Sequence, residues 1–156
     1  MLSSKKELDK HYMKLAIQEA ARAFQVDEVP VGALVVAEKK VLGRAYNQVE
    51  LLKDPTAHAE MLAITQACET LGTARLNGAT LYVTLEPCPM CLGAMIHARI
   101  ERLVFGTREK KTGACGSIVN LMADGKWNHR FRIEEGLLEF ESAAMLQEFF
   151  KKKRVA

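Results

Sequence analysis

Two short segments constrain the fold of this chain more than any other feature of its sequence. They read His58-Ala59-Glu60 and Pro87-Cys88-Pro89-Met90-Cys91, and together they offer one imidazole, two thiols and one carboxylate. Imidazole nitrogen and thiolate sulfur are ligands that zinc prefers, and three protein ligands leave one tetrahedral position open, as in catalytic zinc sites. The fold must therefore bring together two segments that lie far apart in the sequence.

Both segments are predicted to lie at the start of a helix. Thr56 suits the N-cap of a first helix that runs to about Leu71, with Gly72 just past its end. Pro87 suits the start of a second helix that continues over residues 88–98. Two helix N-termini that face each other would hold the imidazole and both thiols around one metal ion, and their positive ends favour ionised thiols.

The rest of the chain alternates between strands and helices. An apolar stripe at helical spacing from Leu8 to Ala23 predicts an N-terminal helix, and β-rich runs over 31–37 and 41–46 predict a hairpin. The later predictions are a strand over 80–85, a strand over 103–106, a short helix near 117–122, a strand over 131–138 and a helix over 143–153 that buries Leu146, Phe149 and Phe150. This order predicts an α/β sandwich, with helices on both faces of a central sheet of about five strands.

Length and composition favour a single domain over residues 1–156. Hydrophobic residues make up 49% of the chain, which is enough for a core, and no low-complexity run, internal repeat or flexible linker divides it. The longest apolar stretch, over residues 31–37, is far shorter than the ~20 residues of a membrane span, and the polar N-terminus is not typical of a signal peptide. Four cysteines in such a chain suggest reduced thiols or metal ligands. We therefore expect a cytoplasmic protein with no membrane segment.

Charge is unevenly distributed along the chain. The formal net charge is only +3, but residues 99–132 carry eight lysines and arginines against three acidic residues, and residues 151–154 are all basic. A basic face of this kind suits a polyanion such as RNA. From charge alone, a solvated surface and a frayed basic tail are the simpler explanation.

The pattern H-x-E followed by P-C-x-x-C is the signature of zinc-dependent nucleobase deaminases. We accordingly predict that His58, Cys88 and Cys91 bind one zinc ion and that Glu60, which need not be a ligand, is the catalytic residue. Zinc lowers the pKa of bound water to ~7 and so makes hydroxide available at neutral pH. Glu60 would take the water proton and deliver protons to a ring nitrogen and to the leaving amine. The predicted reaction is hydrolytic deamination, in which an aromatic amine becomes a carbonyl and ammonia is released.

A structural zinc site is an alternative interpretation of the same residues. Such a site needs a fourth soft ligand. The candidates are Cys68, His97, Cys115 and His129. A structural site has no use for an unligated acid at Glu60, which favours catalysis. Glu86, just before the second motif, is interpreted as a structural hydrogen-bond acceptor.

Beyond the two motifs, longer segments carry a family resemblance that covers nearly the whole chain. They are PVGA (30–33), DPTAHAE (54–60), LYVTLEPCPMCLGAMIHARI (81–100), VFG (104–106), KTGACGS (111–117) and NHR (128–130). With these segments the chain resembles the bacterial tRNA-specific adenosine deaminase (TadA) family of the cytidine deaminase-like superfamily. The resemblance implies a three-layer α/β/α sandwich, a homodimer, one Zn2+ per subunit, and conversion of adenosine to inosine at the wobble position of a tRNA anticodon.

The resemblance also implies roles for residues outside the two motifs. Asn47, which equally suits a turn at the end of the hairpin, matches a contact to the target nucleoside, and the loop over 107–113 matches a stretch near the anticodon stem-loop. The residues implied in substrate binding are Asn47, Arg108, Glu109, Lys111, Lys151, Lys152, Lys153 and Arg154. Two residues depart from the family pattern: Glu109 stands where an aspartate is expected, and Pro89 stands where a small apolar residue is commoner.

Three alternatives remain open at the level of the sequence. A deaminase of free bases or nucleosides, such as guanine or cytosine, would share the zinc chemistry but would have less need of the basic residues over 99–132 and 151–154. A zinc-stabilised RNA-binding module without catalysis would have no need of Glu60. A purely structural or interaction protein would need neither the metal nor the acid.

Overall fold

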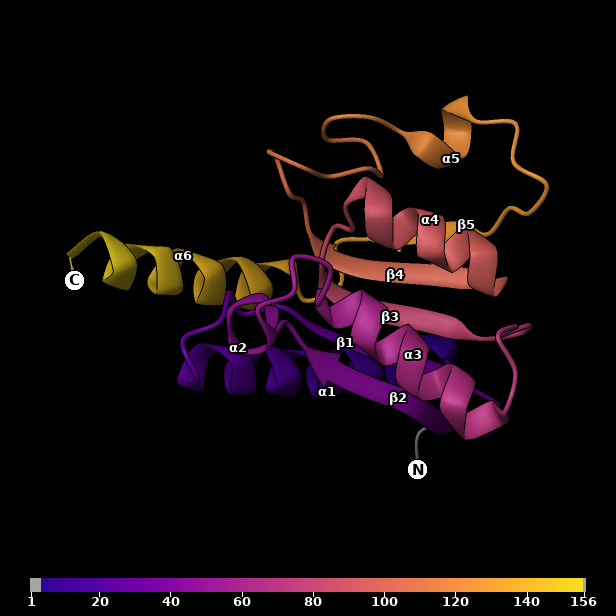
Figure 1. The fold of residues 1–156 in the computed structure, drawn as a ribbon, viewed down its shortest axis with the longest axis horizontal. Coiled ribbons are helices and arrows are strands. Elements are labelled where there is room, and N and C mark those ends of the chain that lie inside the picture. The colour runs from indigo at the N-terminus through magenta and orange to yellow at the C-terminus, as the bar shows by residue number, and fades with distance from the viewer. Residues whose placement is uncertain (1–3, 156) are drawn as a thin grey trace.

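A mixed sheet of five strands forms the centre of the computed structural model, which describes residues 4–155 (Figure 1). The strands are β1 (Gly32–Ala37), β2 (Lys40–Tyr46), β3 (Thr80–Leu85), β4 (Arg102–Thr107) and β5 (Arg132–Glu135), and their order across the sheet is β2-β1-β3-β4-β5. β1 pairs antiparallel with β2 and β3, whereas β3, β4 and β5 run parallel. The predicted mixed sheet is confirmed. Of the domain predicted over 1–156, residues 1–3 and 156 lie outside the described residues.

Helices cover both faces of the sheet (Figure 1). On one face lie α3 (Ala59–Leu71) and α4 (Pro89–Ala98), and on the other α1 (Lys5–Gln25) packs against α6 (Glu139–Val155). The short helices α2 (Val49–Leu52) and α5 (Leu121–Asp124) lie in connecting segments. This arrangement confirms the predicted three-layer α/β/α sandwich. None of the helices described over residues 4–155 combines the length and the apolar character needed to cross a membrane.

The sheet has a core on each side because successive side chains of a strand point to opposite faces. In β1, Leu34 and Val36 pack in the core beneath α1, whereas Ala33 and Val35 pack in the core beneath α3 and α4. A strand covered on both faces has apolar residues at successive positions rather than at alternate ones. This explains the uninterrupted apolar sequence that predicted the first strand of the hairpin.

Two glycines allow helices to lie unusually close to the sheet. A Cβ atom on Gly32 would stand 2.0 Å from the backbone oxygen of Ala16 in α1, and one on Gly43 would stand 2.3 Å from the backbone oxygen of Ala63 in α3. Any larger residue at these positions would push the helix away from the strand. Gly43 therefore sets the depth of α3, the helix that carries the first motif.

The start of α3 differs from the prediction. His58, not Thr56, is the N-cap residue, and the helix begins at Ala59. Thr56 instead donates its backbone N–H and its hydroxyl to the Asp54 carboxylate, at 2.8 and 2.7 Å. Because the Thr56 hydroxyl is already bonded to Asp54 in this turn, it does not cap the helix. The imidazole of His58 therefore lies at the N-terminus of α3. Gly72 ends α3 in the left-handed conformation, as predicted.

The start of α4 also lies later than predicted. Cys88 is its N-cap and Pro89, rather than Pro87, occupies the first helical position. Proline suits that position because its missing N–H would have no partner inside the helix. The departure of Pro89 from the family pattern therefore leaves the start of the helix intact.

Two elements late in the chain are shorter or shifted relative to prediction. The short helix expected near 117–122 forms as α5, where the Asn120 side chain accepts a hydrogen bond from the backbone N–H of Ala123. The strand expected over 131–138 is limited to β5, because the chain turns away at Gly136 with a φ of 93°. Neither change alters the order of the elements.

The C-terminal helix is longer than predicted and buries less. Phe149 is buried and Leu146 packs against the core, as expected, but Phe150 is 44% exposed, so its predicted burial is wrong. The end of α6 extends beyond the sheet (Figure 1), and little protein lies there to cover a second phenylalanine.

Candidate functional site

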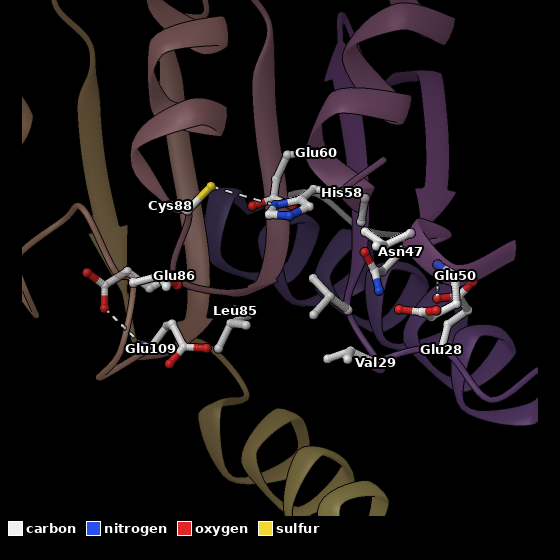
Figure 2. Close-up of a pocket in the computed structure, with 14 residues that line it drawn as sticks. Glu28, Val29, Asn47, Glu50, His58, Glu60, Leu85, Glu86, Cys88 and Glu109 are labelled. Carbon is white, nitrogen blue, oxygen red and sulfur yellow. Dashed lines mark hydrogen bonds between the residues drawn. The ribbon is translucent and has the colours of Figure 1, made fainter. Parts of the chain in front are cut away.

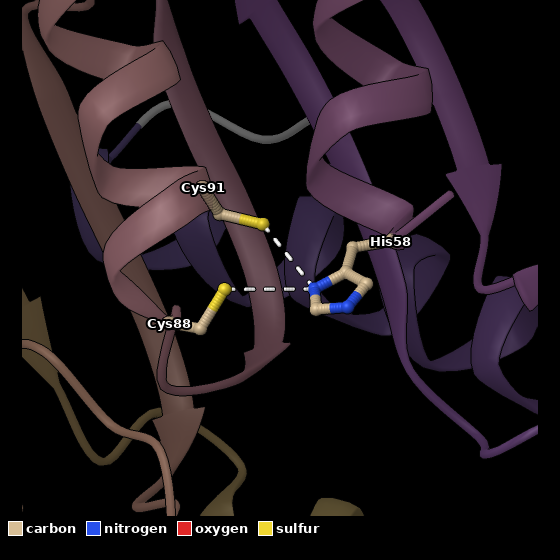
Figure 3. Close-up of side chains that lie close together, drawn as sticks. All are labelled: His58, Cys88 and Cys91. Atoms are coloured by element: carbon tan, nitrogen blue, oxygen red, sulfur yellow. Dashed lines mark hydrogen bonds between the residues drawn. The ribbon is translucent and has the colours of Figure 1, made fainter. Parts of the chain in front are cut away.

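The N-termini of α3 and α4 bring the two sequence motifs together (Figure 3). His58 caps α3, Cys88 caps α4, and Cys91 lies in the first turn of α4. The Nδ1 atom of His58 lies 3.6 Å from the Cys88 sulfur and 3.5 Å from the Cys91 sulfur. Both thiols therefore point toward the same imidazole nitrogen.

These three atoms fit a tetrahedral zinc site. They all lie within 4.8 Å of one another. With a Zn–S distance of about 2.3 Å and a Zn–N distance of about 2.0 Å, tetrahedral coordination separates nitrogen and sulfur by about 3.5 Å, which is close to the observed 3.5 and 3.6 Å. Among residues 4–155, this is the one group of His, Cys, Asp or Glu side chains whose positions suit a metal ion.

The protonation of the cluster also favours a cation. Hydrogen bonds from Cys91 and His58 lower the pKa of the Cys88 thiol to about 4, although burial opposes the change. The contact between Cys88 and Cys91, together with burial, raises the pKa of the Cys91 thiol. A bound metal ion would hold both thiols as thiolates, because thiol ligands lose their proton on binding.

The residues that could have completed a structural zinc site lie elsewhere. They are Cys68, His97, Cys115 and His129, and none of them joins a metal-competent group within the described part of the chain. His129 Nε2 lies 2.7 Å from the backbone oxygen of Ile100, and Cys115 lies buried in the loop beside Glu86. A three-ligand set is the pattern of a catalytic site rather than a structural one.

A cavity of about 240 Å³ opens beside the ligand cluster, and we call it the metal-site pocket (Figure 2). Its walls come from the turn before β1, the segment from Asn47 to α2, the start of α3 and the loop after β4. Carboxylates dominate its polar lining: Glu28, Glu50, Glu60, Glu86 and Glu109. Such a pocket repels anions and offers acceptors to N–H donors.

Glu60 lies beside the ligands in the first turn of α3 and is buried. Burial raises its pKa to about 7. A carboxyl group with a pKa near neutrality can both accept and release a proton at that pH, which suits proton transfer. The side chain borders the metal-site pocket, where a substrate would meet the metal.

Asn47 also lines the pocket, directly after β2 and near His58 (Figure 2). Its backbone N–H donates to the Val31 oxygen at 3.0 Å, which fixes its position. The side chain is only 8% exposed. The hydrogen bonds found over residues 4–155 include none from its amide group, so the amide is available to a molecule in the pocket (Figure 2).

Glu86 acts as a hydrogen-bond acceptor, as the sequence suggested. Its carboxylate accepts the backbone N–H groups of Glu109, Cys115 and Ser117 at 3.0, 2.8 and 3.2 Å, and it also accepts the Ser117 hydroxyl. Burial would raise the pKa of Glu86, but these bonds outweigh burial and lower it. The loop after β4 is thereby tied to the strand end that precedes Cys88.

A second hollow, of about 450 Å³, shares Glu109 with the pocket, and three of its five lining residues are basic. We call it the basic groove, and its lining residues are Glu109, Lys111, Phe150, Lys153 and Arg154. Glu109 lines both cavities. The structure thus gathers three of the predicted RNA-binding cations at one edge of the pocket.

The other predicted RNA-binding cations lie outside both cavities. Arg108 makes a paired hydrogen bond to the Glu135 carboxylate, with both distances at 2.8 Å. Lys152 lies 5.0 Å from the ring centre of Phe24, and Lys151 is exposed on α6. Their predicted contacts with RNA stay predictions.

The sequence interpretation missed Glu28, Glu50 and Thr112, which also line the pocket. Glu28 and Glu50 lie outside both motifs, and nothing in the sequence around them indicates that they face the site. Only Thr112, inside the KTGACGS segment, carried a signal that could have drawn attention to it.

Comparison with known proteins places these features among deaminases. The sequence model of the MafB19-like deaminase family matches residues 7–154. The tRNA-specific adenosine deaminase of Bacillus subtilis is 48% identical over 146 residues, which cover 94% of this chain and 91% of the relative. That of Aquifex aeolicus is 50% identical over 144 residues, covering 92% and 95%. A solved structure from studies of A-to-I editing by tRNA:A34 deaminases at the wobble position of transfer RNA aligns with a TM-score of 0.84 at 47% identity, covering 87% of this chain and 99% of that chain.

Proposed function

The chain belongs to the family of tRNA-specific adenosine deaminases, and from this membership we propose that it converts adenosine to inosine at the wobble position of a tRNA anticodon. One observation in the structure supports the proposal above all others. It is the three-ligand cluster of His58, Cys88 and Cys91, with the buried acid Glu60 beside it at the edge of a pocket.

The residues at the site fit one zinc ion per subunit. His58, Cys88 and Cys91 would hold the ion, which would lower the pKa of a bound water to about 7 and so make it a nucleophile at neutral pH. Glu60 takes one proton from the attacking water and passes it to the ring nitrogen, and the second water proton goes by the same carboxylate to the leaving amine. A C–O bond forms at the purine C6 when the ring nitrogen is protonated, and the C6–N bond breaks after the amine is protonated, so that ammonia leaves.

The acidic lining of the pocket suits a neutral base. Glu28, Glu50 and Glu109 border the cavity together with Glu60 and Glu86, so a phosphate group would be repelled there. A base flipped out of a single-stranded loop carries no charge and offers N–H donors to such a wall. We assign the side-chain amide of Asn47 to orienting that base.

The basic groove suits the phosphates on either side of the target. Lys111, Lys153 and Arg154 line it, and it meets the pocket at Glu109. Phosphate contacts there would set the position of the anticodon stem-loop without reading its sequence. Arg108, Lys151 and Lys152 would act as additional cations on the same polyanion. The homodimer that the family resemblance implies, and the cytoplasmic location expected from the cysteines and the polar N-terminus, belong to this proposal.

A substrate comparison tests the proposal against deaminases of free bases. The purified zinc-loaded protein is incubated with an anticodon stem-loop that carries a wobble adenosine, and separately with free adenosine, guanine and cytosine. We expect inosine in the stem-loop and no conversion of the free compounds. Equal activity on free adenosine, guanine or cytosine would contradict the proposal, because the basic groove would then have no part in the reaction.

A further inference from the structure

One wall of the metal-site pocket depends on a buried carboxylate that neither motif contains. Glu28 follows the end of α1 and is only 1% exposed. Its backbone N–H donates to the Ala23 oxygen at 2.9 Å, which anchors the residue to α1. Its side chain lines the pocket on the same side as Asn47 and Glu50 (Figure 2).

Both carboxylate oxygens of Glu28 are used by the backbone of α2. One accepts the N–H of Glu50 at 3.1 Å, and the other accepts the N–H of Leu51 at 2.6 Å. The first N–H groups of a helix have no partner inside the helix. Gln48, the N-cap residue of α2, makes no capping hydrogen bond with its own side chain. Glu28 therefore performs the capping from outside the helix.

The Glu28 carboxylate is compensated differently from that of Glu19, a buried glutamate within α1. Glu19 is also 1% exposed, but its oxygens pair with the guanidinium groups of Arg22 and Arg44. No ion pair to Glu28 occurs among residues 4–155. Since a buried carboxylate needs compensation, the compensation at Glu28 comes from the backbone that forms the pocket wall.

The segment held in this way carries Asn47. This residue directly follows β2, α2 begins two residues later, and Val49 and Glu50 continue the lining of the cavity. The backbone of Asn47 is tied to Val31, and that of Gln48 is tied to Ala57. The hydrogen bonds from α2 to the Glu28 carboxylate hold the segment after Asn47, and the bond to Val31 holds Asn47 itself. The wall is therefore fixed on both sides of the asparagine amide.

We propose that Glu28 is a positioning residue, which holds α2 and thereby sets the orientation of the Asn47 amide toward the base. The inference rests on the proposed function, because Asn47 is the group through which Glu28 acts. A displacement of about 1 Å at a group that orients the substrate can cost about 100-fold in rate. The effect falls on the chemical step more than on binding, because the basic groove supplies most of the RNA contacts.

The test uses zinc-loaded Glu28→Ala and Glu28→Gln, with Glu19→Gln as the matched control. Single-turnover deamination of the wobble-adenosine stem-loop should fall about 10- to 100-fold in Glu28→Ala and about 3- to 10-fold in Glu28→Gln, with KM changed less than threefold. Glu28→Gln keeps one acceptor oxygen and the length of the side chain, so it serves if Glu28→Ala fails to fold. Glu19→Gln should lower Tm and leave the single-turnover rate unchanged.

A double-mutant cycle separates positioning from general stability. If Glu28 acts through Asn47, the rate of Glu28→Gln/Asn47→Ala should equal that of Asn47→Ala within about threefold. Losses that multiply would overturn the proposal. It would also be overturned if Glu28→Gln lowered Tm as Glu19→Gln does while keeping the wild-type rate.

Amide hydrogen exchange provides a readout that does not depend on the activity. The N–H groups of Glu50 and Leu51 should exchange at least tenfold faster in Glu28→Gln than in the wild type, and the same amides should be unchanged in Glu19→Gln. Unchanged exchange in Glu28→Gln would overturn the proposal. Absence of inosine in the wild type, alongside faster exchange in the variant, would instead count against the proposed function.

Discussion

The metal-site pocket and the basic groove share a border residue but have opposite charge. Five glutamates line the pocket, whereas three of the five residues that line the groove are lysine or arginine. Glu109 belongs to both. An RNA strand that meets this surface can place a neutral base in the first region and its phosphates against the second. Under the proposed function, the difference assigns chemistry to the pocket and RNA positioning to the groove.

The two regions also differ in how their side chains are held. In the pocket, His58 and Cys88 are capping residues of helices, and Glu86 accepts several hydrogen bonds. In the groove, Lys153 and Arg154 are long side chains near the end of α6. Lys153 already pairs with Asp27 at 2.5 Å. Substitutions in the pocket should therefore affect the reaction more than those in the groove.

The largest effect is expected from removing a metal ligand. Cys88→Ala should lower bound zinc well below one ion per chain and reduce inosine formation more than about 1000-fold, because the lowered pKa of zinc-bound water is lost. Zinc content and single-turnover rate measure the two losses. Cys68→Ala, which changes a cysteine of α3 outside the ligand cluster, should keep both. A Cys88→Ala protein that retained zinc and activity would contradict the assignment of the reaction to the metal-site pocket.

A smaller effect, confined to RNA binding, is expected in the basic groove. Arg154→Ala should weaken stem-loop binding several-fold and reduce the slope of log affinity against log salt by about one, with the single-turnover rate at saturation unchanged. Lys153→Ala should change the slope less, because its ammonium group is partly neutralised by Asp27. Salt titrations of binding measure both, and Lys14→Ala, on the exposed side of α1, is the control. A slope that stayed at the wild-type value in Arg154→Ala would show that the groove does not bind phosphate.

The smallest functional effect is expected far from both regions, at the ion pair of Asp9 and Arg102. Burial would raise the pKa of Asp9, but hydrogen bonds from Arg102 and Tyr82 outweigh it and hold the pKa below the ordinary 3.8. A lowered pKa stabilises the fold above the ordinary value, and that stability is lost as pH falls through the lower folded value. Acid unfolding should therefore begin below about pH 4 in this part of the protein.

The matching variant separates stability from function. Asp9→Asn should lower the free energy of unfolding by about 2 to 3 kcal/mol at pH 7, because Arg102 keeps Glu134 as a partner but loses a buried one. Urea denaturation at pH 7 and at about pH 3 measures the change, and the difference between variant and wild type should shrink at the lower pH, which lies below the ordinary pKa of Asp9. The single-turnover rate and the salt slope should stay at wild-type values. A change in either would link the ion pair to the site.

The metal cluster could be predicted from the sequence because its geometry is local to two helix starts. The three ligands lie at or next to the N-caps of two helices. To bring them together, the fold has only to place these two helix starts side by side. The N-cap at Thr56 was wrong for an equally local reason. The Asp54 carboxylate satisfies the threonine in a preceding turn, so the capping position passes to His58.

The second wall of the pocket could not be predicted in the same way. Glu28 and Glu50 are close in space because the turn after α1 is hydrogen-bonded to the start of α2 through the Glu28 carboxylate. Charge patterning alone would place Glu28 in solvent, whereas it is buried. The prediction that Phe150 is buried was wrong for a related reason. Helical periodicity indicates which face of α6 is apolar, but not that the helix extends beyond the sheet that would cover it (Figure 1).

The separation of chemistry from RNA positioning is tested most directly by Glu60→Gln. This variant keeps the size of the side chain and every metal ligand, and it removes the proton shuttle. Zinc content, stem-loop affinity and single-turnover inosine formation are measured on the same protein. We expect one zinc per chain, wild-type affinity and salt slope, and a fall in rate of about 100- to 10,000-fold. A near-wild-type rate, or a loss of RNA affinity as large as the loss of rate, would contradict the separation.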